Sequence, residues 1–404
     1  MSLLPLLVVV ILLATGMGTA LLGSIKVTLA RQLQIDEARI GGLLATFGFT
    51  LIPAMLAAGF VSHLVGRQPV VIGGAILFSV SLGVFAQATA YWMVLVAVLL
   101  LSAAWATLIN VVNPLSLPAF GGSEAYALNL GCFIFGIGSF VTPVGVAFLV
   151  RRLEVRNTLL LLAASGVVIA VLACAADFPS LAPAPAKPAQ ATTATHPDSP
   201  GAAAASVRGP EAASPAPGLG TLLRDPVMWL CALALFFYMP AEATMAAWAT
   251  TYVTDKGMKE GSASALLSGF WIAYTASRLV AAFTLPKGAE TMVILVLSVV
   301  SVGVWVAVVL CRGRGLAAAL VLVVGVIFGP IYPTLLAVLL GHFAPSLHGR
   351  AIGLFFTLGG LGCTALPMLI GAYARRTSVQ RGFILAAASA AGLALIALLL
   401  HVKA

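Results

Sequence analysis

The chain has 404 residues, of which 61% are hydrophobic and only 8% are charged. Soluble domains carry about a quarter charged residues, so this composition excludes a soluble globular protein. The formal net charge of +9 does not indicate nucleic-acid binding, because the basic residues are scattered over short segments between apolar stretches. The chain is therefore expected to lie in a lipid bilayer and to bind no nucleic acid.

Apolar stretches of about 20 residues, the length that spans a bilayer as a helix, recur along nearly the whole chain. The first set covers residues 3–23, 40–61, 70–88, 92–115, 125–150 and 158–176. The second set covers residues 227–253, 263–285, 292–310, 316–341, 351–374 and 381–401. This pattern predicts an all-α integral membrane protein with twelve transmembrane helices, six in each set.

The segment between the two sets, residues 177–226, is rich in alanine and proline. Such a composition is typical of a flexible or extended linker. We therefore expect an N-terminal six-helix bundle (residues 1–176), a cytoplasmic linker (177–226) and a C-terminal six-helix bundle (227–404). The even division indicates an internal duplication.

The loop between the second and third predicted helices, residues 59–69, reads GFVSHLVGRQP. It resembles the loop signature G-x-L-A-D-R-x-G-R-R/K of the major facilitator superfamily, with Gly59, Gly66 and Arg67 at matching positions. His63 stands where the signature has its aspartate. The resemblance implies a gating role for these four residues, and a tight basic turn without such a role is the alternative.

A second resemblance lies in residues 237–252, FYMPAEATMAAWATTY. They resemble the YxGxE…W…Y helix of the fucose permease-like branch of the superfamily, the sugar:proton symporters, at Tyr238, Glu242, Trp248 and Tyr252. Segments 271–278, 328–334 and 359–367 continue the resemblance in the expected order. It implies two pseudo-symmetric six-helix bundles with a substrate bound near the midplane between them.

Ionisable residues within predicted spans are candidates for function, because they are costly in a bilayer. Glu242 lies near the middle of its span, with Tyr238 one helical turn before it. The sugar-symporter branch places a carboxylate four residues before Asn113, and this chain has Ile109 there. Glu242 is therefore the candidate proton-coupling residue, and a neutral glutamic acid bonded to a neighbouring helix is the alternative.

Side chains suited to a sugar occur in both halves. We expect Asn110, Asn113 and Asn129 to bind hydroxyl groups, with adhesion between helices as an equal alternative. Besides Glu242, the candidates in the second half are the aromatic residues Tyr238, Trp248, Trp271, Tyr274 and Tyr332. Arg278 lies toward one end of its span, where it either serves a substrate or a gate, or extends to the membrane interface.

Two signals for the orientation in the membrane conflict. The linker and the loop around Arg67 favour a cytoplasmic position, which would place both termini in the cytoplasm. However, more basic residues, among them Arg151, Arg152 and Lys256, fall in loops that would then lie outside, against the positive-inside rule. We expect a multi-pass protein of the cell (inner) membrane with both termini cytoplasmic.

The predicted function is secondary transport of a small polar, sugar-like solute by alternating access, with protons as the candidate coupling ion. We expect a monomer without cofactor or metal, because cysteine and histidine residues show no ligand spacing. One alternative is a drug or metabolite efflux antiporter, which a partial helix-five signature around Pro143 favours. Another is a non-transporting membrane sensor or a polytopic membrane enzyme, although no cluster of acid–base residues is visible.

Overall fold

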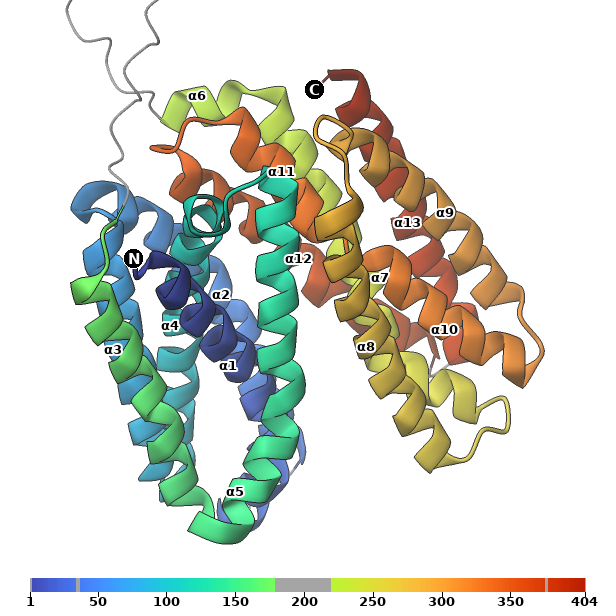
Figure 1. Ribbon diagram of the computed structural model, residues 1–404. Coiled ribbons are helices and arrows are strands. Elements are labelled where there is room, and N and C mark those ends of the chain that lie inside the picture. The colour runs from blue at the N-terminus through green and yellow to red at the C-terminus, as the bar shows by residue number, and fades with distance from the viewer. Residues whose placement is uncertain (1, 34–36, 179–218, 375–376, 404) are drawn as a thin grey trace, which may run out of the picture.

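A computed structural model describes residues 2–33, 37–178, 219–374 and 377–403, and every secondary-structure element in these ranges is a helix. The helices form two bundles (Figure 1). Within the described residues, eleven helical segments are long and apolar enough to span a membrane, and the 27-residue α12 occupies the place of a further predicted span. The prediction of an all-α, multi-pass membrane protein is confirmed.

The first bundle, which we call the N-half, contains α1 (Leu4–Leu33), α2 (Glu37–Val65), α3 (Arg67–Ala86), α4 (Tyr91–Phe120) and α5 (Glu124–Ala175). α1 runs past the predicted end at residue 23, because a helix can continue beyond the apolar stretch that defines the span. α5 joins the fifth and sixth predicted spans. Its backbone turns at Glu154, whose φ of 63° interrupts the helical conformation.

The second bundle, the C-half, contains α6 (Leu219–Arg224), α7 (Pro226–Thr254), α8 (Glu260–Thr284), α9 (Glu290–Leu310), α10 (Arg314–Phe328), α11 (Ile331–His342), α12 (His348–Ala374) and α13 (Val379–Lys403). α6 lies within the predicted linker, most of which falls outside the described residues. A helix forms there because Leu222 is buried and the Leu223 carbonyl accepts a hydrogen bond of 2.8 Å from the Trp229 indole.

The span predicted at residues 316–341 is divided into α10 and α11. Pro330 and Pro333 lack the amide N–H that an α-helix requires at these positions, so two hydrogen bonds of the helix cannot form. The carbonyl groups of Val326 and Gly329, four residues before the two prolines, lose their usual partners. The resulting bend lies beside α7 and α8, and it becomes important for the candidate site.

The two halves meet through α2 and α12, and through α5 with α8 and α11; we call these contacts the seam. The two backbones approach closely at Gly59, where a Cβ atom would lie 2.8 Å from the carbonyl carbon of Gly349. Figure 1 shows the bundles meeting toward the end where α5 finishes and α6 and α7 begin, and diverging toward the opposite end. We call these the linker end and the far end.

Candidate functional site

The bend between α10 and α11 presents two carbonyl oxygens to side chains of neighbouring helices. The hydroxyl of Tyr238 on α7 donates to the Phe328 carbonyl at 3.0 Å. Nε of Arg278 on α8 donates to the Gly329 carbonyl at 3.0 Å. Pro333 cannot donate to that carbonyl, and a polar group left unpaired in a bilayer is costly. Arg278 therefore supplies the bond that Pro333 removes, and Tyr238 bonds the neighbouring carbonyl.

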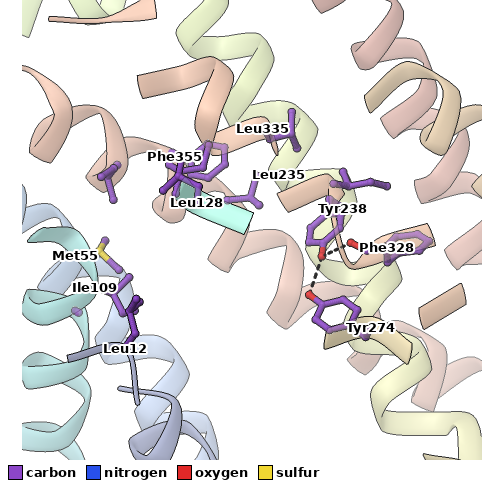
Figure 2. Packing of buried hydrophobic residues seen from close by; sticks show 14 of the residues in the cluster. Leu12, Met55, Ile109, Leu128, Leu235, Tyr238, Tyr274, Phe328, Leu335 and Phe355 are labelled. Carbon is purple, nitrogen blue, oxygen red and sulfur yellow. Dashed lines mark hydrogen bonds between the residues drawn. The ribbon is translucent and has the colours of Figure 1, made fainter. Parts of the chain in front are cut away.

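The same side chains form a hydrogen-bonded cluster with Tyr274, and Glu242 lies on the same helix as Tyr238. The hydroxyls of Tyr238 and Tyr274 lie 2.9 Å apart, and Figure 2 shows them turned toward each other. Nη2 of Arg278 donates to the Tyr274 hydroxyl at 2.5 Å. Glu242 lies one helical turn after Tyr238 on α7. The structure thus brings together three of the residues that the sequence singled out.

Arg278 is buried, with 6% of its surface exposed. Its guanidinium group stacks over the Tyr274 ring at 4.2 Å, and Nη1 reaches the Cys132 carbonyl of α5 in the N-half at 3.4 Å. Among the described residues, no carboxylate lies within ion-pair distance of it. The alternative that Arg278 extends to the membrane interface does not describe this side chain, which points into the protein and contacts both halves.

The three asparagine candidates are engaged within the protein. Nδ2 of Asn110 donates to the Gly349 carbonyl at 2.9 Å, and Nδ2 of Asn129 lies 3.3 Å from the Thr334 hydroxyl, so both bridge the seam. Their Oδ1 atoms have no partner among the described groups. Asn113 donates to the Ile109 carbonyl at 2.9 Å and also interacts with Tyr332 of the C-half. Their binding of hydroxyl groups stays a prediction.

The aromatic candidates differ in exposure. Trp271 is 38% exposed and packs edge-on against Tyr274, with ring centroids 5.5 Å apart. Tyr238 is 1% exposed, so it would not contact a solute directly and would act by positioning the side chains that it bonds. The Tyr332 ring lies 6.0 Å from the guanidinium of Arg278. Trp248 lies further along α7, and its indole nitrogen is buried without a partner in the described part of the chain.

The candidate gating loop lies at the linker end. Gly66 has a φ of 88°, a conformation that favours glycine, and it lets the chain turn between α2 and α3. Arg67 donates to the Pro345 carbonyl at 3.0 Å, so this basic residue contacts a backbone group of the C-half. His63 is half-buried near the end of α2.

Several contact residues were not predicted, namely Cys132, Phe328, Gly329, Thr334 and Gly349. Four of them contribute backbone groups, which carry no side-chain signal in a sequence. Pro333 was the available clue, since it identifies the Gly329 carbonyl, four residues earlier, as a group that needs another donor. The position of Gly349 beside Gly59 depends on how the two halves pack, which the sequence does not reveal.

The fold and the family model agree on the class of protein. The chain belongs to the Major Facilitator Superfamily, whose family model matches residues 7–367. The described residues contain no cluster of His, Cys, Asp and Glu suited to a metal ion.

Individual relatives extend this comparison. The structure of FucP in the outward conformation covers 98% of both chains with a TM-score of 0.77 and 16% identity, and FucP is described elsewhere as the E. coli fucose:proton symporter. The human organic anion transporter MFSD10 covers 98% of both chains, with a TM-score of 0.67 and 17% identity. Bypass of stop codon protein 6 of Saccharomyces cerevisiae is 29% identical over 181 residues, 42% of this chain and 36% of that protein.

Proposed function

We propose that this protein is a secondary active transporter that moves a small polar, sugar-like solute across the membrane in symport with protons. The observation that carries the proposal is the position of Glu242, a carboxyl group inside a spanning helix, one helical turn after Tyr238. Ionisable groups are rare at such depth and mark transport pathways and proton relays. Glu242 would take the role of the carboxylate that is absent at Ile109.

The solute would be recognised by groups of both halves. Trp271, which is partly exposed, offers a ring face to the apolar side of a sugar, and Glu242 and Tyr274 offer hydrogen bonds beside it. Asn113 approaches from the N-half and lies next to Tyr332. Since these residues come from α4, α7, α8 and α11, relative movement of the halves would open and close the site.

Transport would proceed by rocking residues 1–176 against residues 227–404. The contacts named at the seam lie toward the linker end, and the bundles diverge toward the far end (Figure 1). If the linker is cytoplasmic, this arrangement is the outward-facing state. The structural likeness to FucP in the outward conformation supports this assignment.

The second candidate function is efflux of an organic anion or drug by antiport. The likeness to the organic anion transporter MFSD10 favours it, and so does the buried positive charge of Arg278, which has no carboxylate within ion-pair distance among the described residues. Counter-transport of protons would use the same Glu242.

Uptake into proteoliposomes under an inward proton gradient tests the proposal. We expect Glu242→Gln to abolish gradient-driven accumulation of a sugar identified in a thermal-shift screen, and to leave exchange of that sugar without a gradient. Glu260→Gln is the matched control, because Glu260 is exposed at the start of α8. Gradient-driven accumulation by Glu242→Gln at the wild-type level would refute proton coupling through Glu242.

A further inference from the structure

Basic side chains of both halves gather where the seam reaches the linker end; we call them the basic cluster. On the N-half, His63 lies in the last turn of α2 and Arg67 begins α3. On the C-half, His348 and Arg350 lie in the first turn of α12. Among the described residues, no carboxylate lies within ion-pair distance of any of the four. This end of the seam therefore carries basic groups without an acidic partner.

Close packing of α2 against α12 brings two members of the basic cluster together. A Cβ atom on Gly59 would lie 3.2 Å from the amide nitrogen of Arg350, so α2 touches the first turn of α12. The guanidinium of Arg350 lies 6.0 Å from the centre of the Phe60 ring, the residue after Gly59. His63 follows Gly59 by four residues and therefore shares its face of the helix, one turn nearer the linker end. His63 and Arg350 thus belong to the same helix contact.

The turn before α12 brings in the other two members. Nη2 of Arg67 donates to the Pro345 carbonyl at 3.0 Å. The His348 ring faces the same turn, with Nε2 at 2.9 Å from the Phe343 carbonyl and at 3.0 Å from that of Leu340. Carbonyl oxygens only accept, so Nε2 carries a proton and donates it. Arg67 and His348 are therefore held on one short stretch of backbone.

Two buried polar atoms of the basic cluster lack a partner among the described residues, namely Nδ1 of His348 and Nε of Arg350. His348 is only 4% exposed, and polar atoms buried in this way are as a rule hydrogen-bonded. Nε of Arg350 can only donate, and Nδ1 of His348 donates when the ring is protonated. Both atoms are therefore suited to an acceptor with negative charge.

The start of α12 adds backbone donors to the basic cluster. The amide of Ala351 bonds the Leu347 carbonyl one turn back, and the amides before it belong to the first turn, which a helix leaves open. The helix dipole also favours negative charge at this end. A phosphate group has several acceptor oxygens, and it binds both to helix N-termini and to arginine, whose guanidinium can donate two parallel hydrogen bonds. Phosphate therefore fits the donors present better than a halide ion does.

The charges of the basic cluster also affect how the halves close. Arg67 and Arg350 stay protonated at physiological pH, and they belong to opposite halves. Their repulsion opposes closure of the linker end, whereas an anion between them attracts both. Such an anion loses one set of contacts when the halves separate, so it binds the closed form more tightly and favours it.

We propose that the basic cluster is a binding site for a phosphate group, taken from a phospholipid headgroup or from inorganic phosphate, and that the bound group bridges the two halves at the linker end. The inference is independent of the solute and of its coupling ion, because it rests on the seam alone.

Binding is tested on the purified full-length protein with two sources of the phosphate group. Its melting temperature is followed in neutral detergent as inorganic phosphate is added, with sodium chloride of equal ionic strength as the reference. It is also measured in nanodiscs of phosphatidylcholine with increasing phosphatidic acid. We expect a saturable rise with at least one source, because a ligand of the folded state stabilises it. A rise with inorganic phosphate identifies the free anion, and a rise with phosphatidic acid alone identifies the headgroup.

Variants that remove one cation test the composition of the site. For Arg67→Gln and for Arg350→Gln, we expect the amount of phosphate or phosphatidic acid that gives half the maximal rise to increase about tenfold or more, the range of one hydrogen bond to a charged group. Lys287→Gln is the matched control, because Lys287 is exposed in the loop between α8 and α9, outside the basic cluster. It should keep the wild-type value.

A substitution at His63 tests the site by adding an anion. His63→Asp places a carboxylate in the basic cluster, so we expect a higher melting temperature in chloride and the loss of most of the response to phosphate. His63→Asn is similar in size but neutral, and it should keep the response. A purely structural effect of replacing the histidine would change both variants alike.

Three results would overturn the inference. One is that neither source raises the melting temperature beyond the chloride reference. Another is that Arg67→Gln and Arg350→Gln respond as Lys287→Gln does, and the third is an equal response in His63→Asp and His63→Asn. If one glutamine variant does not fold, the other variant and the pair at His63 decide by the same criteria. The proposed function fails only on the uptake assay with Glu242→Gln.

Discussion

Replacing Gly59 with alanine is expected to force the two halves apart at the linker end. The added Cβ would lie 2.8 Å from the carbonyl carbon of Gly349, closer still to its oxygen, and 3.2 Å from the amide nitrogen of Arg350. All three are backbone atoms, so no side chain can turn away to relieve the overlap. The backbones of α2 and α12 must separate instead.

The magnitude follows from two contributions. Overpacking of a well-packed contact costs about 1–3 kcal/mol, and separation also weakens the Asn110 to Gly349 bond of 2.9 Å, worth about 1 kcal/mol. Together they amount to about 2–4 kcal/mol, and at about 1.4 kcal/mol for each factor of ten the closed population should fall roughly thirtyfold to several hundredfold. Gly48→Ala is the matched control in the same helix, since its Cβ would meet no atom within 4 Å.

The assay measures the distance between two spin labels, attached to cysteines that replace Glu124 and Lys287. Both positions are exposed and lie at the linker end. The Gly59→Ala protein should show long distances at the linker end, while the Gly48→Ala protein should resemble the wild type. Both substitutions favour the helix by about 0.5–1 kcal/mol, so a general effect of alanine cancels in the comparison. Equal distance distributions in the two variants would refute the claim that this backbone contact closes the linker end.

Two further predictions concern stability and orientation. Asp225 is partly buried, which raises its pKa, but the hydrogen bonds from His342 and from the start of α7 outweigh this and hold the pKa below its usual value. The ionised Asp225 therefore stabilises the fold above the usual pKa range of a carboxyl group, and this stabilisation is lost as pH falls through the lowered pKa. We expect the melting temperature of Asp225→Asn to fall less steeply in acid than that of the wild type. An equally steep fall in both proteins would contradict this. Cysteines at Ser2 and Arg152 should react with impermeant maleimide from the cytoplasm and from outside respectively, and the reverse pattern would invert the predicted orientation.

The fold could be predicted well because each spanning helix is specified by its own apolar stretch. Helices α3, α9 and α13 begin and end within a few residues of the predicted positions. The bend at Pro330 divides a span without ending the apolar pattern, so hydropathy alone could not separate this span from a straight one. The resemblance to family motifs predicted, in addition, that the helices form two six-helix bundles.

The candidate site was predicted in part. The spacing of Tyr238 and Glu242 on one helix, and of Tyr274 and Arg278 on another, was readable because it follows from helical periodicity. That the two pairs meet depends on the packing of α7 against α8. The direction of Arg278, into the protein and toward α5, depends on a carbonyl that Pro333 leaves unpaired, and this required knowledge of the bend.

Three of the hydrogen bonds between the halves join a side chain of one half to a backbone carbonyl of the other. Arg278 bonds the carbonyl of Cys132, Asn110 that of Gly349, and Arg67 that of Pro345. A backbone carbonyl persists whichever side chain its residue carries, so these contacts do not require two side chains to change together. Among related sequences, pairs of positions that bridge the halves should therefore show little correlated substitution, even where the contact itself is maintained.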